Sequence, residues 1–134
     1  MLNLDTHILI WYVAGRLSPE EQRCLTGQDF AISDIVLWEL AMLAEDSRLS
    51  LNLDHPEFQA FLSTLHVFPI TLEIARKSTQ LDFSSDPADE IIAATSVVEK
   101  VPLLRAIGAF AGLKWFRWLS DQQGGAPPFA SFLA

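Results

Sequence analysis

The chain has 134 residues, a length that suits one hydrophobic core and excludes a protein of several large domains. Half of its residues are hydrophobic and 19% are charged, which excludes a disordered chain. Seventeen Asp and Glu against nine Lys and Arg give a net charge of −8, so any nucleic-acid partner would need help from bound cations.

Cysteine content and N-terminal composition bear on the compartment. The chain has a single cysteine, Cys24, so an intrachain disulfide is excluded. The first residues lack the basic start and the cleavage site of a signal peptide. The longest clean apolar run, residues 8–14, is far shorter than the roughly 20 residues of a membrane span. We therefore expect a cytoplasmic protein with no membrane segment.

Short apolar runs alternate along the chain with segments of helical character. Strands are expected at residues 2–4, 30–33, 67–70 and 101–104, and helices at 8–14, 35–45, 72–81 and 91–98. A further short strand is expected around residues 113–118. Because parallel strands need a crossover between them, this alternation predicts an α/β fold with a mostly parallel sheet.

Three helix starts have a recognisable capping signal. Ser18 precedes Pro19 and stands three residues before Glu21, the pattern of a capping box. Thr71 and Asp86 are likewise predicted to be N-cap residues. Residues 122–128 are rich in Gly, Pro and Gln and cannot continue a helix or a central strand. We therefore predict a compact domain at 1–121 followed by a tail at 122–134.

Two carboxylates stand where the pattern favours other residues. Asp5 directly follows the first expected strand, where an open parallel sheet binds ligands, although it could equally cap the following helix. Glu39 has apolar neighbours three and four residues away on its helix, so its carboxylate needs a partner. A salt bridge to Arg76 or Arg105, or a backbone hydrogen bond, would be a purely structural explanation.

A third group of acids follows Pro87. Asp86, Asp89 and Glu90 are spaced to crowd one first helical turn. Acids in a first turn also complement the helix dipole, so capping alone explains each of them singly. Like charges about 4 Å apart repel by about 4 kcal/mol at an effective dielectric of 20, so together they indicate an external cation.

The acids come from three separated segments without a His or Cys motif beside them. Oxygen-only ligand sets suit Mg²⁺ or Mn²⁺ and disfavour zinc. The three histidines lack metal-ligand spacing, and the chain has no Gly-rich phosphate loop. The residues alone thus favour a carboxylate site for a hard divalent cation.

Four segments resemble, in order and spacing, the PIN-domain proteins of the VapC toxin type. They are residues 4–11, 32–33 with 38–41, 47–51, and 86–89 with 91–95. The resemblance runs from the first residues to about residue 104. It implies a PIN-like α/β fold, with a central parallel sheet sandwiched between helices, and a metal-dependent ribonuclease paired with an antitoxin.

The resemblance also implies roles for individual residues. Asp5, Glu39 and Asp89 match the catalytic acids that hold Mg²⁺ or Mn²⁺. Asp86 matches an accessory acid, and Thr6 and Ser33 match hydroxyl positions beside the site. The implied reaction is hydrolysis of RNA phosphodiester bonds. The implied partners are a cognate antitoxin and a second copy of the chain, in a homodimer.

Two departures from the family pattern concern activity. Glu90 stands where the family usually has Arg, and Ile107 stands where it usually has a fourth acid. Glu90 is a candidate to restore the missing charge from a different element. The alternative to an active nuclease is therefore a degenerate PIN-like binding module, catalytically weak or inactive, that sequesters an antitoxin.

Further expectations concern the rival chemistry and the surface. A phosphatase with Asp5 as nucleophile is the weaker rival, because Asp-x-Asp is absent and Glu39 would have no role.

An apolar partner surface is expected on the helix that carries Ile8, Trp11 and Tyr12 and on the next helix. The candidate cations for RNA contact are Arg16, Arg48, Lys114 and Arg117.

Overall fold

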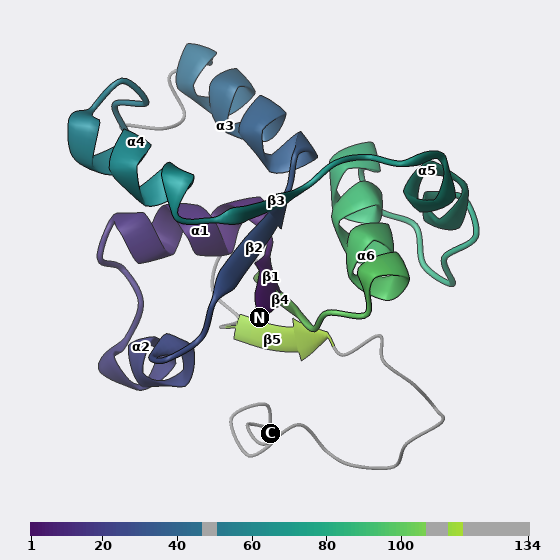
Figure 1. Cartoon of the computed structure of the whole chain (residues 1–134), viewed down its shortest axis with the longest axis horizontal. Helices are drawn as coiled ribbons and strands as arrows, with labels where there is room; N and C mark the ends of the chain where they lie inside the picture. The colour runs from purple at the N-terminus through teal and green to yellow at the C-terminus, as the bar shows by residue number, and fades with distance from the viewer. Residues whose placement is uncertain (47–50, 107–112, 117–134) are drawn as a thin grey trace.

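The computed structural model describes residues 1–46, 51–106 and 113–116 (Figure 1). Its strands and helices alternate along the chain. They are β1 Leu2–Leu4, α1 Thr6–Val13, α2 Pro19–Leu25, β2 Phe30–Ser33, α3 Ile35–Glu45, α4 Pro56–Ser63, β3 His66–Phe68, α5 Leu72–Ser78, α6 Pro87–Glu99, β4 Leu103–Ala106 and β5 Leu113–Phe116. The predicted α/β fold is confirmed.

The strands form one sheet in the order β3-β2-β1-β4-β5. β1 pairs in parallel with β2 and β4, and β2 pairs in parallel with β3. β5 runs antiparallel to β4. The chain thus moves outward from β1 to β3 and then crosses back to β4 on the other side of β1. Open parallel sheets bind ligands beyond the carboxyl ends of strands at such a reversal.

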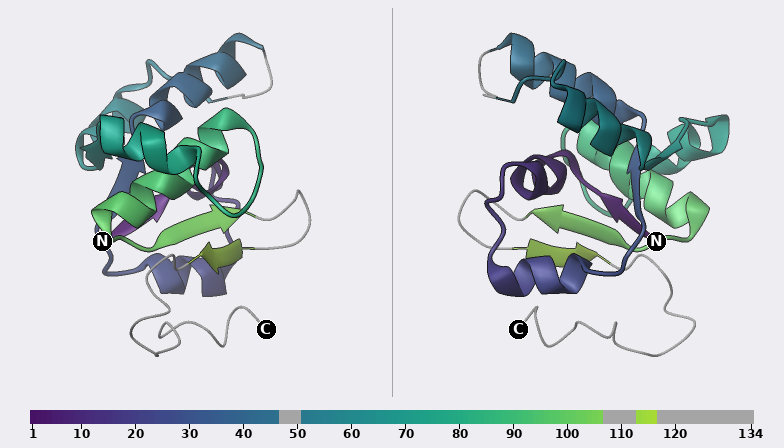
Figure 2. Two further views of the ribbon diagram at one scale, coloured as in Figure 1. Left: turned by 90° about the vertical axis from the view of Figure 1, so that its right-hand side faces the viewer. Right: turned by 60° about the vertical axis from the view of Figure 1, so that its left-hand side comes forward.

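Helices flank the sheet on both sides. In Figures 1 and 2, α1 and α2 lie on one side of the sheet, and α5 and α6 lie on the other. α3 contacts both α1 and α6, and Figure 1 shows it above the end of β2. The starts of α1, α3 and α6 are therefore brought to the same end of the sheet.

The core lies between the sheet and these helices. Leu4, Ile8 and Ile32 are fully buried, and Ile92 and Leu104 are almost so. These side chains come from β1, α1, β2, α6 and β4 in turn. A single apolar core therefore fixes the relative positions of the elements that carry the predicted acids.

A buried polar residue ties β1 to α6. Asn3 is fully buried, and its Nδ2 donates to the Ile92 carbonyl at 3.2 Å and to the Ser96 Oγ at 2.8 Å. These bonds cross the interior between two segments that lie far apart in the sequence. They fix α6 against the central strand, just below the turn that carries Asp89.

The predicted helix starts agree with the structure, and one helix was not predicted. α2 begins at Pro19, and Thr71 caps α5 by accepting from the Ile74 N–H at 3.2 Å. The Glu21 side chain lies outside the described residues. α4 was missed, although His55 precedes a Pro at its first position, a usable helix-start signal.

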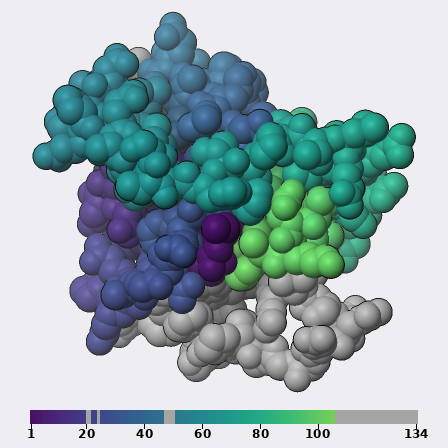
Figure 3. Space-filling model, in the orientation of Figure 1, coloured from purple at the N-terminus to yellow at the C-terminus, as the bar shows by residue number. Residues whose placement is uncertain are grey.

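The apolar surface was predicted on two helices, and the structure shows it on the second of them, α3. Ile8 is fully buried, and Trp11 and Tyr12 pack against the core. The exposed large apolar side chains are found mainly on α3 and along residues 67–72, from β3 to the first residue of α5, a segment that crosses the face in Figure 3. They include Leu37, Trp38, Met42, Val67, Ile70 and Leu72.

The helices in residues 1–46 and 51–106 bear on the expected lack of a membrane segment. In this part of the chain, none of the helices combines the length and the apolar character that crossing a bilayer requires. The predicted boundary at 121 and the tail at 122–134 lie outside the described residues.

Candidate active site

The first candidate acid lies at the carboxyl edge of the central strand. Asp5 directly follows β1, is buried, and donates its backbone N–H to the Leu104 carbonyl at 3.0 Å. Its Oδ1 accepts from the Ile8 N–H at 2.8 Å, so Asp5 also caps α1, as one of the two predicted explanations requires. Capping fixes the carboxylate in place at the end of the strand.

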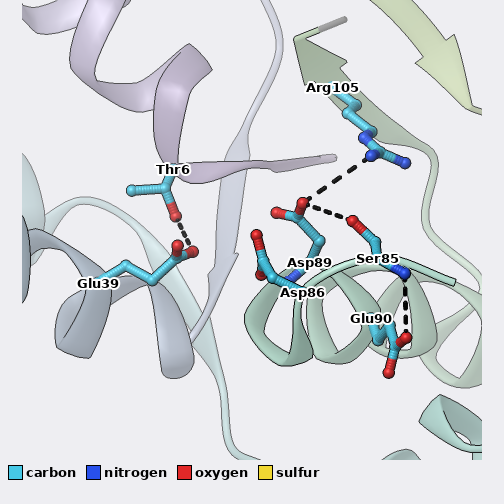
Figure 4. Close-up of polar contacts among 7 residues, drawn as sticks. All are labelled: Thr6, Glu39, Ser85, Asp86, Asp89, Glu90 and Arg105. Atoms are coloured by element: carbon cyan, nitrogen blue, oxygen red, sulfur yellow. Dashed lines mark hydrogen bonds and ion pairs between the residues drawn. The ribbon is translucent and has the colours of Figure 1, made fainter. Parts of the chain in front are cut away.

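Glu39 reaches this edge from α3. Its Oε1 accepts a hydrogen bond of 2.5 Å from the Thr6 hydroxyl (Figure 4). Thr6 is buried, and it follows Asp5 directly, so the bond brings the α3 carboxylate next to the first acid. The Thr6 hydroxyl is thus the described partner of Glu39, in place of the salt bridges weighed from the sequence.

The first turn of α6 supplies two further carboxylates. Asp86 is the N-cap and accepts from the Asp89 N–H at 2.9 Å. Asp89 is half-buried, and its Oδ2 accepts from the Ser85 hydroxyl at 2.9 Å. Figure 4 shows Asp86 and Asp89 on the side of this turn that faces Thr6 and Glu39. Three of the predicted acids therefore face a common space.

Arg105 on β4 enters the same space from the sheet. Its guanidinium lies 3.9 Å from the Asp89 Oδ2. The same guanidinium lies over the ring of Phe83, with 5.6 Å between its central carbon and the ring centroid. The sequence suggested Arg105 as a partner for Glu39, whereas the structure pairs it with Asp89.

Two accessory residues serve neighbouring turns. Ser33 is fully buried at the end of β2, and its Oγ accepts from the Ile35 N–H at 3.4 Å, at the turn into α3. The Glu90 Oε1 accepts from the Ser85 N–H at 3.1 Å. In Figure 4 the Glu90 carboxylate points away from Glu39. The Glu90 carboxylate is thus bonded to the preceding loop here, and its role as a substitute for the missing acid stays a prediction.

The facing acids perturb one another. Burial raises the pKa of Glu39 above its usual 4.5, the Thr6 hydrogen bond opposes this shift, and the charges of Asp89 and Asp86 add to it. Burial also raises the pKa of Asp89 above 3.8, with Asp86 adding to the shift and Ser85 and Arg105 opposing it. The site therefore carries more negative charge than its surroundings stabilise.

The donor set fits a hard divalent cation in its chemistry. Asp5, Glu39, Asp86 and Asp89 offer carboxylate oxygens, and the raised pKa values show a local need for positive charge. Within residues 1–46, 51–106 and 113–116, no three His, Cys, Asp or Glu side chains are already gathered closely enough to hold a metal ion. Binding would require Glu39 and Asp89 to turn from Thr6 and Ser85 toward a shared ion.

Two residues that contribute to the acidic site were not predicted from the sequence, and several predicted residues lie outside the described part of the chain. Ser85 was not singled out, although its place directly before an N-cap Asp was a usable signal. His7 was predicted to be a surface or satisfied histidine and is exposed, and its electrostatic effect lowers the pKa of Glu39. Ile107, Arg48 and Arg117 lie outside the described residues, as does the Lys114 side chain.

This combination of fold and acids matches a known family. A model of the PIN domain matches residues 3–106. The chain belongs to the PIN-domain family. The match covers every described acid of the site and all of the parallel strands except the first residue of β1. PIN domains are generally nucleases, which suits a cluster of carboxylates at this edge.

Solved structures support the same assignment. A toxin–antitoxin complex from Klebsiella pneumoniae is 25% identical with a TM-score of 0.59, covering 77% of this chain and 83% of that one. VapBC2 from Rickettsia felis, bound to a DNA fragment from their promoter, is 20% identical with a TM-score of 0.55, covering 77% of this chain and 85% of that one. No curated protein matches. The predicted resemblance to PIN domains of the VapC type is confirmed.

The charge balance of the PIN-domain site leads to a stability prediction. In metal-free protein, Glu39→Gln is expected to raise the free energy of unfolding at pH 7, because it keeps the Thr6 acceptor and removes a poorly stabilised charge. The folded-state pKa of Glu39 is raised, so this gain should be full above that pKa and should disappear as pH falls toward 4.5. Urea denaturation in EDTA at several pH values measures it. A less stable variant at pH 7 would contradict the charge assignment.

Proposed function

We propose that this PIN domain is a metal-dependent endoribonuclease and the toxin of a type II toxin–antitoxin pair. The strongest support is geometric: three carboxylates, from α3 and from the start of α6, face one another beside Thr6. They are Glu39, Asp86 and Asp89. Burial and mutual repulsion raise the pKa values of Glu39 and Asp89. A purely structural cluster would be expected to pair these charges more completely.

The proposed ligands of Mg²⁺ or Mn²⁺ are Asp5, Glu39 and Asp89. When bound, such a cation would polarise the phosphodiester and activate a water molecule as the nucleophile. Asp86 is exposed beside Asp89, so it is placed to orient that water and accept its proton. Thr6 orients the Glu39 carboxylate through its hydrogen bond. Ser33 supports this arrangement by fixing the turn into α3.

The acidic character of the chain sets a condition on RNA binding. A protein of net charge −8 repels a polyanion unless its acidic pocket is neutralised. Arg16 is exposed and available for phosphate contact, and Arg48, Lys114 and Arg117 remain proposals for the same role. The bound cation is thus expected to serve both substrate binding and chemistry.

The test of this function is cleavage of RNA by the purified full chain. We expect fragments from labelled RNA with Mg²⁺ or Mn²⁺ and none after treatment with EDTA. Returning the metal should restore cleavage, which separates metal loss from damage to the protein. Cleavage that survives the chelator would contradict the metal-dependent mechanism.

The proposed partners are an antitoxin and a second copy of the chain. An antitoxin segment carrying Arg is expected to reach the acidic site and replace the metal by charge-assisted hydrogen bonds. For the homodimer, the exposed Leu37, Trp38 and Met42 on α3 offer apolar surface of the kind that interfaces bury.

The proposed dimer can be tested by measuring the molecular mass in solution. Light scattering at tens of micromolar should give twice the mass of the 14.9 kDa chain. A Trp38→Ser variant should shift the population toward monomer, because Trp38 is 55% exposed and removing it costs the isolated fold little. A strict monomer for the parent chain would contradict the dimer and leave the antitoxin proposal standing.

One observation favours the second candidate function, a binding module without strong catalysis. Asp89 already has a cationic partner in Arg105, so the site can be partly neutralised without a metal. The two functions predict different results in the RNA-cleavage experiment. A folded protein that binds Mn²⁺ poorly and leaves RNA intact would favour the binding module.

A further inference from the structure

Arg105 has a position that the proposed chemistry does not explain. It follows Leu104 on β4, and the Leu104 carbonyl accepts from the Asp5 N–H at 3.0 Å. Its backbone therefore stands beside the first proposed ligand, while its guanidinium reaches the third, Asp89, at 3.9 Å. The strand that carries Arg105 is thus bonded to the backbone of Asp5, and its side chain contacts the Asp89 carboxylate.

Two contacts hold the guanidinium at this place. Phe83 supplies an aromatic face at 5.6 Å, a geometry of cation–π attraction. The Asp89 Oδ2 that faces Arg105 also accepts from the Ser85 hydroxyl at 2.9 Å. This oxygen thus already has one hydrogen-bond donor and one cationic partner. Arg105 is 26% exposed, so its charge is only partly screened by water.

We propose that Arg105 is an internal counter-cation of the acidic site, which competes with the divalent cation for Asp89 and so sets the metal concentration at which the site fills. The inference rests on the proposed function and adds a form of regulation to it. The Arg105 guanidinium and a divalent cation bound to the same Asp89 carboxylate would repel each other. Metal binding therefore requires Arg105 to leave Asp89, and its free guanidinium then lies at the mouth of the site.

The test is Mn²⁺ binding by the full chain, stripped of metal and studied without RNA. Free Mn²⁺ is quantified by electron paramagnetic resonance during a titration of the parent and of Arg105→Met. Met keeps an apolar stem for Phe83 and removes the charge. We expect the variant to bind Mn²⁺ about tenfold more tightly, since a repelling unit charge has gone.

Two controls separate this effect from a general change in charge. Arg105→Lys keeps the positive charge and should bind Mn²⁺ much like the parent. Arg23→Met removes the same charge from an exposed residue in the last turn of α2, and should leave the affinity within about twofold because solvent screens distant charges.

Thermal unfolding supplies a readout that a purely structural ion pair would not give. In EDTA, Arg105→Met should melt below the parent, because Asp89 loses its partner. In saturating Mn²⁺ the variant should gain more in melting temperature than the parent does. A purely structural role predicts an equal gain from the metal. If Arg105→Met fails to fold by circular dichroism, Arg105→Gln takes its place.

The outcomes are distinguishable. Unchanged or weaker Mn²⁺ affinity in Arg105→Met, with the parent binding normally, overturns the counter-cation role and leaves the proposed nuclease intact. Failure of both proteins to bind Mn²⁺ overturns the inference together with the metal-dependent function. Tighter binding in Arg105→Met, with both controls unchanged, supports the inference.

Discussion

Glu39→Gln and Asp5→Asn are each expected to reduce metal-dependent RNA cleavage by at least about a hundredfold, the usual scale for losing a group that holds the catalytic charge. Both changes preserve side-chain size and remove one negative charge. Gln at position 39 can still accept from Thr6, and Asn at position 5 can still cap α1 through the Ile8 N–H. The fold should therefore persist while the ligand is lost.

The matched control lies on the same helix as Glu39. Glu45 is exposed at the last residue of α3, so Glu45→Gln removes the same charge away from the site. Its cleavage rate should stay within about twofold of the parent rate, because exposed charges at a distance are screened. Initial rates at saturating Mn²⁺ measure the effect, with circular dichroism to verify folding. Full activity in Glu39→Gln would remove Glu39 from the mechanism.

Leu4→Ala is expected to lower the free energy of unfolding by about 2–5 kcal/mol, as for other buried Leu side chains. Leu4 is fully buried on the central strand, directly before Asp5. The truncation leaves a cavity between the sheet and its helices and loosens the strand that presents the first acid. Urea denaturation monitored by circular dichroism measures the loss.

Leu72→Ala provides the comparison for this core substitution. Leu72 is 68% exposed at the start of α5, so the same truncation removes little buried surface. Its effect should stay within about 0.5 kcal/mol. Equal losses in the two variants would show that β1 is not part of the core as described.

The parallel sheet could be predicted because short apolar runs alternate with helical segments along the chain. β1 and β2 have the predicted bounds, and Asp5 and Asp86 cap α1 and α6 through local contacts that the sequence shows directly. Local hydrogen bonds between residues three apart depend on little else, so they can be predicted from spacing.

Long-range geometry limited the rest of the prediction. Glu39 was recognised as needing a partner, yet choosing Thr6 over Arg105 requires knowing how α3 sits against α1. Glu90 was a candidate to restore the missing charge, although it lies on a different element from the missing acid. The turn of the helix instead directs Glu90 to the Ser85 backbone. Neighbours along a helix share a turn but not necessarily a direction.

The apolar surface shows the same limit. The helix that carries Ile8 and Trp11 and the next helix were both expected to carry apolar surface, because together they hold more than one small core can absorb. In the fold, α1 packs against β4 and α3, and Ile8 is fully buried. Trp38 on α3 is exposed instead. Hydrophobic content alone does not tell which of two apolar helices is covered when each crosses the same end of a sheet.

The measurement that tests the central claim most directly is anomalous diffraction from crystals of the full chain soaked in Mn²⁺. The account predicts one Mn²⁺ peak at the carboxyl edge of β1, with oxygens of Asp5, Glu39 and Asp89 within about 2.0–2.3 Å. It also predicts that the Arg105 guanidinium has moved away from Asp89. No peak among these residues, at a Mn²⁺ concentration that supports cleavage in solution, would contradict the account.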